Sequence, residues 1–596
     1  MRLTNVSHLR LPFGRLIGYD VAAGPPGRPL PVSFDQRRHI GAGDRPGSWM
    51  ALSFALPRRV DREDLAAAWL SVIARHGTLR SVFGPAPDGA ADDAPQLHEL
   101  EIGPGAWREH AIGPGQAVED ALRQVLDAHC RPFARPAHRL CALETADATT
   151  VVIGVDHAHV DMWSMLVIGR DLLAGLAARG AAPAPQELPE TVPSFAEHTA
   201  QLAGRPPAPE EVRRRWAEVL AASGEVMPRF PLPLGEAASQ PERVEVRDVL
   251  DADDSAAFAA EARASGASTL ALTVSAMTEV TRELAGAPLR AVFPVHSRHE
   301  ARWHDSVGWF ITNSVLESDD PAPMACAAAI TEAIRLGSWP LAEVLEPWGG
   351  MPEAPGMFAI SWLDLRRLPV RFDSAGLGAQ YVSAAIRTDG VMLWFILDDA
   401  GLHLRCRYPD TPQARDGVGS WLDALVARMR RRARESAGDV LRCGGRTYRI
   451  QRAAREDVPA IRALLADDEI GRTREGGQED AAEYEAAYDR VAQDRAHYLA
   501  VVRDEAGDVV GTMQLTILPG LSRQGSARMQ IEGVRVARSE RSRGLGSAML
   551  GWAHEHGRAR GARLAQLTTD LGREEARAFY ARLGYAESHA GLKRPL

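Results

Sequence analysis

The chain of 596 residues is longer than a single hydrophobic core supports, so we expect roughly three or four compact units of about 150 residues each. A net charge of −9 at pH 7 gives no overall basic field for nucleic acid, and 45% hydrophobic with 25% charged residues is ordinary for a folded soluble protein. The first residues lack the order of a signal peptide, and no apolar run reaches the roughly 18 residues of a membrane span. We therefore expect a cytoplasmic protein that binds neither membranes nor nucleic acid.

The five cysteines are widely scattered and include no CxxC pair, so they predict neither a disulfide framework nor a zinc site. We expect reduced thiols and no metal cofactor. Lys593 is the only lysine, which nearly excludes a catalytic lysine.

The first 437 residues carry two successive sets of strand and helix patterns. The first set predicts strands at 49–57, 79–83, 140–143 and 150–155, and helices at 61–76, 116–130 and 163–179. After a helix at 207–222 and a breaker-rich connection at 224–243, the second set predicts helices at 269–285 and 414–435, and strands at 290–295, 357–363 and 391–408. We expect one lobe at 1–185 and a second at 186–437.

A third unit is expected at 447–596, after a linker at 435–446. Its pattern predicts strands at 448–452, 498–504, 509–517, 531–536 and 565–568, and helices at 456–468, 544–559 and 574–583. Strands and helices mixed over about 150 residues are typical of an independent α+β domain. The chain as a whole is therefore expected to be α/β.

One glycine-rich segment in this unit, Arg541 to Ala548 (RSRGLGSA), follows a predicted strand and opens a predicted helix. Glycines let successive backbone N–H groups approach a pyrophosphate closely, and a helix start adds partial positive charge. Arg541 and Arg543 supply further hydrogen bonds to phosphate. Glycine-rich turns are common in proteins, so the strands and helices predicted around this segment have to indicate whether it binds phosphate.

With that pattern, the segment resembles the Arg/Gln-x-x-Gly-x-Gly/Ala motif of the GNAT N-acetyltransferases, and the tail at 577–585 (RAFYARLGY) is similar to the closing helix of that family. The resemblance implies a GNAT fold that binds acetyl-CoA. The pyrophosphate is expected on the amides of 541–546 and the pantetheine arm beside a splayed strand at 534–536. The implied cofactor-binding residues are Val534, Val536, Arg541, Arg543, Gly544, Leu545, Gly546 and Ser547.

Two further residues are candidates for acetyl-transfer chemistry. The resemblance implies that Tyr580 protonates the leaving thiolate, although a core tyrosine would look the same in the sequence. Glu532 lies on the same strand face as Val534, where it would accept a proton from an ammonium group, directly or through water. A strand carboxylate in a salt bridge is an equally good interpretation of Glu532.

The segment Asp156-His-Ala-His-Val-Asp161 follows a predicted apolar strand and precedes a helix. A histidine at such a transition, with a near-neutral pKa, can take a proton from an attacking amine or hydroxyl. A carboxylate four residues on can fix the loop by pairing with an arginine. Taken alone, this composition is also compatible with a metal site formed by His157, His159 and Asp161, or with a solvated turn.

In its wider context this segment resembles the HHxxxDG signature of the condensation domains of nonribosomal peptide synthesis and related acyltransferases. Three other blocks are similar to that family in the same order: 33–38 (SFDQRR), 75–83 (RHGTLRSVF) and 307–314 (VGWFITNS). Asp156 replaces the first histidine and Met162 the closing glycine. We expect Asp156 to favour a charged imidazole on His157 if the two groups are close, and Met162 to reshape the donor channel.

The resemblance implies two chloramphenicol-acetyltransferase-like lobes that form a V, with His157 in the middle of a tunnel between them. Donor and acceptor would enter on phosphopantetheine arms of carrier proteins. His157 would act as the base or orient the nucleophile, and Asp161 would be structural, paired with Arg80 or Arg298. Asn313 would help to position the lobes.

The sequence therefore predicts a bifunctional acyltransferase of specialised, peptide-type metabolism. The first module would join a carrier-bound thioester to a small-molecule amine or hydroxyl, and the second would acetylate an amine. One alternative makes the first 435 residues a non-catalytic scaffold that presents a carrier-bound substrate. Another makes the GNAT domain a self-resistance module that acetylates a toxic product.

Overall fold

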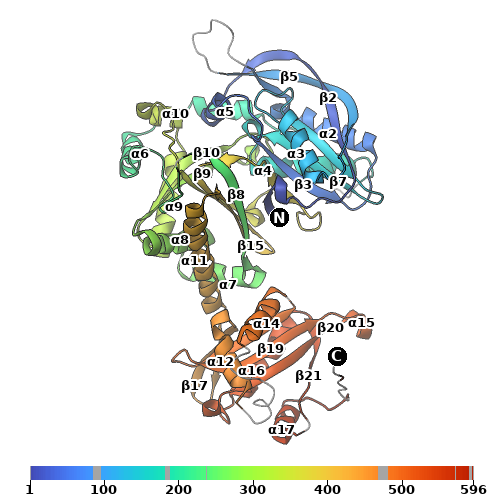
Figure 1. Ribbon diagram of the computed structural model, residues 1–596, viewed down its shortest axis with the longest axis vertical. Coiled ribbons are helices and arrows are strands. Elements are labelled where there is room, and N and C mark those ends of the chain that lie inside the picture. The colour runs from blue at the N-terminus through green and yellow to red at the C-terminus, as the bar shows by residue number, and fades with distance from the viewer. Residues whose placement is uncertain are drawn as a thin grey trace. The chain divides into compact units, whose positions relative to one another are not determined.

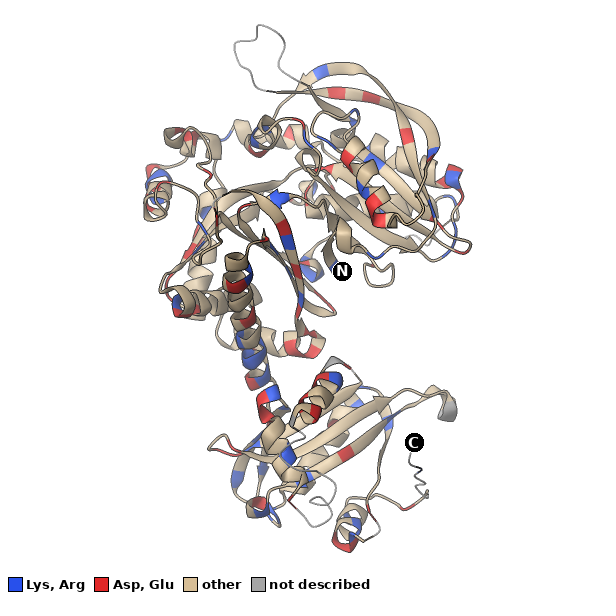
Figure 2. Cartoon of the chain, in the orientation of Figure 1, with Lys and Arg blue, Asp and Glu red and all other residues tan. Residues whose placement is uncertain are grey.

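The computed structural model describes residues 2–84, 95–181, 188–236, 238–467, 481–494, 496–570, 572–589 and 594. Its chain divides into two compact units, Met1–Arg430 and Arg431–Leu596 (Figure 1). The expected lobe boundary at 185/186 lies outside the described residues. Positive and negative residues are interspersed along the visible helices of both units (Figure 2). Within the described residues, no helix combines the length and apolarity needed to cross a membrane.

The first unit begins with an eight-stranded sheet. In spatial order its strands are β1 (Arg2–Asn5), β12 (Gln380–Ser383), β3 (Trp49–Leu56), β7 (Thr149–Asp156), β6 (His138–Glu144), β2 (Arg15–Leu30), β5 (Gln96–His110) and β4 (Ser81–Gly84). The helices α2 (Arg62–Arg75) and α4 (Met162–Ala177) pack on one face, and α3 (Val118–His129) packs on the other. The predicted strands β3 and β7 and these three helices are confirmed to within two residues.

A second, seven-stranded sheet follows in the same unit. Its order is β10 (Ile311–Ser318), β9 (Leu289–His296), β11 (Phe358–Asp364), β14 (Val391–Asp398), β15 (Gly401–Pro409), β8 (Gln240–Asp251) and β13 (Arg387–Thr388). The helix α8 (Thr269–Ala285) packs against α9 (Pro323–Gly337), and Trp421 of α11 (Pro412–Ala437) donates a hydrogen bond to Thr281 of α8 at 3.1 Å. The helix α6 (Glu210–Ala222) packs with Val292, Val315 and Ala359 of the sheet.

The order of β12 ties the two sheets of the first unit together. This strand comes from the second half of the unit but pairs with β1 and β3 of the first sheet. Because the chain crosses from one sheet to the other and back, the lobes share backbone hydrogen bonds. The sequence patterns did not predict this exchange.

The second unit contains a six-stranded sheet. Its order is β16 (Asp439–Cys443), β17 (Arg446–Arg452), β18 (His497–Arg503), β19 (Val509–Leu518), β20 (Ala527–Val536) and β21 (Ala562–Leu567), with only β20 and β21 parallel. The helices α12 (Val458–Leu465) and α14 (Ala481–Gln493) pack on one face, and α16 (Leu545–Ala559) packs on the other. The helix α17 (Glu574–Arg582) follows β21.

The expected linker at 435–446 is wrong, because this segment forms the end of α11 and the strand β16. Cys443 and Arg446 pair across a two-residue turn in which Gly444 and Gly445 have φ values of 56° and 75°. Two central residues with positive φ form the type I′ turn that favours tight hairpins. The Gly-Gly pair was the sequence signal for this hairpin.

Candidate active sites

The first site forms where the buried strand β7 ends. All eight residues of β7 are buried, and a single 3₁₀ turn, His157–His159, connects the strand to α4. The backbone N–H of His157 donates to the carbonyl oxygen of Ser48 at 3.0 Å. Asp161 caps α4 by accepting a hydrogen bond from the N–H of Ser164 at 2.7 Å. His157 and Asp161 are therefore held on a short turn that is fixed at both ends.

The imidazole of His157 stacks on the indole of Trp309, with ring centroids 4.3 Å apart and an interplanar angle of 28°. Its Nδ1 atom is buried and has no hydrogen-bond partner among the described residues. Burial, assisted by the charge of His39, lowers the pKa of His157 to about 4. The ring is therefore neutral near pH 7 and can accept a proton.

The charge of Asp156 raises the pKa of His157, as expected, but burial and the charge of His39 outweigh this effect and leave the imidazole neutral at pH 7. The Asp156 carboxylate accepts hydrogen bonds from Ser48 Oγ and from the N–H of Ala158, the latter at 2.9 Å. Its Oδ1 lies 3.5 Å from Nε2 of His39. Burial raises the pKa of Asp156, but the hydrogen bond and charge of His39 outweigh this effect and leave the pKa lowered. Asp156 is thus paired with His39, which the sequence analysis did not single out.

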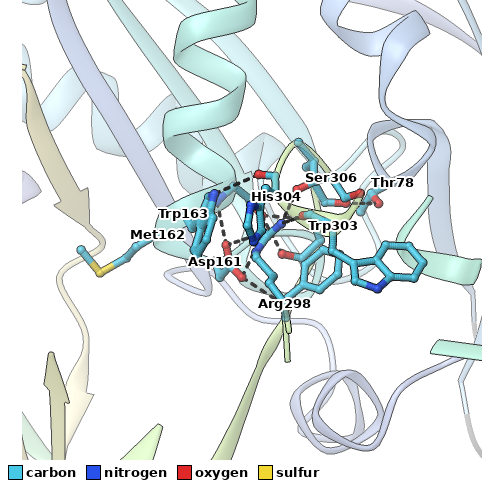
Figure 3. A network of polar contacts seen from close by, with 12 residues as sticks. Thr78, Asp161, Met162, Trp163, Arg298, Trp303, His304 and Ser306 are labelled. Atoms are coloured by element: carbon cyan, nitrogen blue, oxygen red, sulfur yellow. Dashed lines mark hydrogen bonds and ion pairs between the residues drawn. The ribbon is translucent and has the colours of Figure 1, made fainter. Parts of the chain in front are cut away.

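Asp161 is buried and its partner is Arg298 (Figure 3). Nη2 of Arg298 lies 3.1 and 3.3 Å from the two carboxylate oxygens, and the N–H of Phe310 donates to Oδ2 at 3.1 Å. Arg80, the other expected partner, is exposed. The pair joins the start of α4 to the loop after β9, so it connects the two lobes.

The Nη1 atom of Arg298 has two backbone carbonyl oxygens as hydrogen-bond acceptors. It donates to the carbonyl oxygens of Trp303 and Ser306 at 2.7 and 2.6 Å, and the guanidinium lies 3.8 Å from the centre of the Phe310 ring. Nη2 also donates to Ser164 Oγ at 2.7 Å. Charged hydrogen bonds of this kind, made inside a protein, fix geometry strongly.

The sequence blocks that resemble one family meet at this contact. Ser164 Oγ donates to the carbonyl oxygen of Gly308 at 2.8 Å and accepts from its N–H at 3.1 Å. Thr78 Oγ1 donates to the carbonyl oxygen of Val307 at 2.6 Å. The blocks at 75–83, 156–162 and 307–314 are therefore in direct contact, although His76 instead pairs with Asp171 at 2.9 Å.

The other residues of this region that the sequence pointed to each have different contacts. Met162 points away from the Asp161–Arg298 pair in Figure 3, and its carbonyl oxygen accepts a hydrogen bond from Tyr381. His159 Nδ1 lies 3.4 Å from Ser81 Oγ. Within the part of the chain that the structure describes, His157, His159 and Asp161 do not form a group that could hold a metal ion. Asn313 lies on β10, with Nδ2 4.0 Å from Met351 Sδ.

The second site forms around β20. Between Thr512 and Gln514 of β19 the register with β20 shifts, so that the segment Glu532–Arg535 carries an extra residue, and Gly533 has a φ of 60°. The parallel pairing with β21 ends at Ile531. Val534 and Val536 therefore lie beyond the last residue of β20 that pairs with β21, which itself ends at Leu567.

The turn after β20 leads into α16. Gly544 occupies the position before the helix with a φ of 84°, and among the described residues no side chain forms a hydrogen bond that caps this helix start. Leu545 is buried and anchors the first turn, whereas Ser547 is exposed. A Cβ atom on Gly546 would lie 3.3 Å from Phe579. The first N–H groups of α16 are thus open to an anion.

The two arginines of the turn, both predicted to bind phosphate, contact other groups of the chain in this structure. Arg541 donates from Nε to the carbonyl oxygen of Val536 at 3.0 Å and from Nη2 to Asp467 at 2.8 Å. Arg543 lies 3.8 Å from the buried carboxylate of Glu540. Arg541 therefore joins the turn to β20 by a hydrogen bond, whereas Arg543 makes only the longer contact with Glu540.

Tyr580 and Glu532 are not joined by a hydrogen bond. Burial raises the pKa of Tyr580, and the charge of Arg535 on β20 opposes this shift. The ring packs 5.3 Å from Phe579 and 5.9 Å from Tyr585. Glu532 is exposed and lies opposite Gln514 of β19. At pH 7 the phenol keeps its proton, as a thiolate-protonating acid requires.

Two family models match the chain. Residues 42–333 match the condensation domain, and residues 459–585 match the acetyltransferase (GNAT) family. A solved structure, the PapA2 acyl transferase, superposes with a TM-score of 0.63 at 20% identity, covering 73% of this chain and 100% of that one. The condensation-type acyltransferase fold is thereby confirmed for the first unit.

Three curated proteins are similar in sequence. The acyltransferase PapA3 of Mycobacterium tuberculosis is 24% identical over 70% of this chain and 92% of its own length. The aminoalkylphosphonate N-acetyltransferase of Salmonella typhimurium is 29% identical over 25% of this chain and 90% of its own length. A probable non-canonical nonribosomal peptide synthetase of Salinispora arenicola, CymA, is 30% identical over 49% of this chain, which spans only 4% of that protein. The chain therefore contains a condensation domain over residues 42–333 and a GNAT acetyltransferase domain over residues 459–585.

Proposed function

We propose that the chain is a bifunctional acyltransferase of specialised, peptide-type metabolism. The condensation domain forms an amide or ester from an acyl or aminoacyl thioester, which a carrier protein delivers on its phosphopantetheine arm. The GNAT domain transfers acetyl from acetyl-CoA to an amine. The observation that carries the proposal is the neutral imidazole of His157, held at a strand end whose position is fixed by the buried Asp161–Arg298 pair.

At the condensation site, His157 is the group that meets the nucleophile. As an amine or hydroxyl attacks the thioester carbon, a C–N or C–O bond forms and the C–S bond breaks. The imidazole takes the proton of the nucleophile and passes it to the departing thiolate. Asp161 does not take part in this transfer, because its oxygens are bonded to Arg298, Ser164 and Phe310. It positions the loop.

At the acetyl site, the fit to acetyl-CoA rests on the open helix start and the bulged strand. The first N–H groups of α16 are arranged to bind the pyrophosphate, and the free edge of Val534–Val536 to pair with the pantetheine amides. Acetyl-CoA bound there supplies an activated acetyl thioester. Glu532 is placed to take the proton of the acceptor ammonium, and Tyr580 to return a proton to the thiolate.

The acetyl site is tested by a charge placed at the start of α16. Ser547→Asp puts a carboxylate where the helix dipole favours it, so the helix keeps its stability, but the carboxylate repels a pyrophosphate. We expect acetyl-CoA binding, measured by calorimetry on the full chain, to weaken at least about tenfold, equivalent to about 1.4 kcal/mol. The isosteric control Ser547→Asn should bind normally. Equal binding by both variants would contradict the proposed site.

A second candidate function, a scaffold that only presents a carrier-bound substrate, is favoured by the stacking of Trp309 on one face of His157. His157→Ala separates the two functions. If His157 is the base, the variant loses the condensation product while it still binds acetyl-CoA. If the domain is a scaffold, the wild type forms no condensation product, and the variant retains all acetylated product. Trp309→Leu, which uncovers the imidazole, should raise the rate only in the first case.

A further inference from the structure

Two arginines of β15, Arg405 and Arg407, lie over the same indole ring. Their guanidinium carbons are 4.8 and 5.2 Å from the ring centre of Trp394 on β14. Arg405 is 3% exposed, and the side chain of Arg407 is 14% exposed. An indole face stabilises a cation, but it does not neutralise its charge.

The negative charge near this pair is too small to balance it. Among the described residues, Glu242 is the only carboxylate within 4.0 Å of either guanidinium, with Oε2 3.9 Å from Nη1 of Arg407. Arg405 donates from Nη2 to the hydroxyl of Ser383 at 2.7 Å, and Nη2 of Arg407 faces the sulfur of Met392, a weak acceptor. Two buried cations thus share one carboxylate.

Donor atoms of the pair are also unused. Nε of Arg405 and Nε of Arg407 are buried without a hydrogen-bond partner, as is Oε2 of Glu242. Burial, and then the charge of Arg407, lower the pKa of Arg405 to about 10, so the group remains charged at pH 7. A buried charge without a partner is costly, so a ligand that supplied the missing negative charge would be bound favourably.

The position of the pair connects it with the condensation site. Arg405 pairs in register with Trp394, and Trp394 with Ser361 of β11, so these side chains share one face of the seven-stranded sheet. Ser383, the partner of Arg405, belongs to the eight-stranded sheet. The pair therefore lies on the sheet face that meets the other lobe, where Trp394 and Ser361 remain partly exposed.

We propose that Arg405 and Arg407 form an oxyanion site for a carboxylate carried by a substrate of the condensation domain. This inference rests on the proposed function, because it assigns the substrate class of that site. Two guanidinium groups offer the planar, forked donors that bind a carboxylate, and Trp394 offers an apolar surface to the adjoining chain of the substrate. The selected acyl donor or acceptor is then an acid with a free carboxylate in addition to its reacting group.

Butyrate and butyramide test the site directly, since they differ only in charge and hydrogen bonding at one end. By calorimetry on the full chain in chloride-free buffer, we expect butyrate to bind and butyramide not to bind. Arg405→Gln and the less buried Arg407→Gln should each weaken butyrate at least about tenfold. Arg387→Gln, on β13 of the same sheet but exposed, is the matched control and should bind butyrate normally.

His157→Ala distinguishes this inference from the proposed function. Butyrate binding by that variant should be unchanged, because the site needs no turnover. Retained binding together with full condensation activity would contradict the proposed function alone. Absence of butyrate binding in a chain whose condensation activity depends on His157 would overturn the anion site alone. Binding of inorganic phosphate without binding of butyrate would overturn the assignment of a carboxylate.

The melting temperature supplies a second readout. Removing a surplus buried charge should raise the melting temperature of the anion-free chain, so Arg405→Gln is expected to melt higher than the wild type. If Arg405 were a balanced structural ion pair, the same change would leave Glu242 or its neighbours unpaired and lower the melting temperature. That result would overturn the inference.

Discussion

Asp161 and Arg298 form the contact on which the first site depends. The carboxylate caps α4, receives the N–H of Phe310 and pairs with a guanidinium that is 2% exposed. Removing one partner of a buried pair leaves an uncompensated charge, which typically costs about 3–5 kcal/mol. The pair therefore has a structural effect that extends to His157, four residues earlier in the chain.

We expect Asp161→Asn to lower the free energy of unfolding of the first unit by about 3–5 kcal/mol. The asparagine keeps an oxygen for capping α4 but leaves Arg298 without a counter-charge. Urea unfolding followed by tryptophan fluorescence measures this unit, because every tryptophan except Trp552 precedes Arg430. Arg80→Gln, at the exposed alternative, should change nothing, and an effect of equal size there would refute the pairing.

The pKa of His157 predicts how the condensation rate depends on pH. An unperturbed histidine with a pKa of 6.5 would lose its base form below that pH, whereas burial lowers the pKa of His157 to about 4. The imidazole therefore stays unprotonated between pH 8 and pH 5. With a hydroxyl acceptor, whose own ionisation does not interfere, kcat/KM should be flat over this range once it is referred to the fraction of the chain that is folded at each pH. An apparent pKa near 6.5 would contradict the buried site.

The sequence alone predicted some single residues of the first site and not others. It identified His157 and Asp161, because a recognisable motif contains them. It left Arg80 and Arg298 as equal partners, since only the fold brings the loop after β9 to α4. It missed His39, whose role comes from a contact with Asp156 far away in the chain.

At the scale of elements, close approaches fix the position of the loop before β10. Gly308 lies against Phe195 of α5 (Phe195–Ala203), where an added Cβ would lie 2.4 Å from the ring. The ring is buried, so it cannot move away without disturbing its neighbours. The requirement for glycine here comes from packing, because no positive φ is recorded for Gly308.

We expect Gly308→Ala to destabilise the first unit by about 1–3 kcal/mol, the usual cost of overpacking a filled core. It should also reduce condensation, because Gly308 is bonded to Ser164 at the start of α4. Gly419→Ala, in α11 with open space around it, is the control and should stabilise by about 0.5–1 kcal/mol. Equal tolerance of both changes in urea unfolding would show that Phe195 does not enforce the glycine.

Elements with a strong local pattern were predictable, and exchanged or tightly turned elements were not. The helices α2, α3 and α4 lie where the spacing of apolar residues in the sequence predicts helices. The strand β12 was missed because its partners come from the other half of the unit. The pattern at 435–446 predicts a linker, whereas the structure has the strand β16 there, followed by a turn at Gly444 and Gly445.

At the scale of the whole molecule, buried histidines make the first unit sensitive to acid. Burial lowers the pKa of His138 to about 3, and burial together with nearby charges lowers those of His157, His159 and His198 to about 4. Below pH 6.5 the unfolded chain binds protons that the folded unit excludes. The stability of the unit is therefore complete above pH 6.5 and is lost as the pH falls towards 4.

We expect the free energy of unfolding of the first unit to fall by up to about 5.6 kcal/mol per pH unit below 6.5, or about 1.4 kcal/mol for each of the four histidines. Urea unfolding at pH 7.5, 6.5 and 5.5, followed by tryptophan fluorescence, measures this slope. His198→Gln removes one such group and should reduce the slope by about a quarter. Equal stability at pH 7.5 and 5.5 would be incompatible with neutral buried histidines.

The measurement that tests the account most directly is intact-mass analysis of carrier-bound acyl substrates incubated with an amine or hydroxyl acceptor, with and without acetyl-CoA. For the wild-type chain we predict one mass for the condensed product and a further mass, larger by one acetyl group, that requires acetyl-CoA. His157→Ala should abolish the first product and leave acetylation of free amines intact. Condensed product formed undiminished by His157→Ala would contradict the assignment of this histidine and, with it, of the first active site.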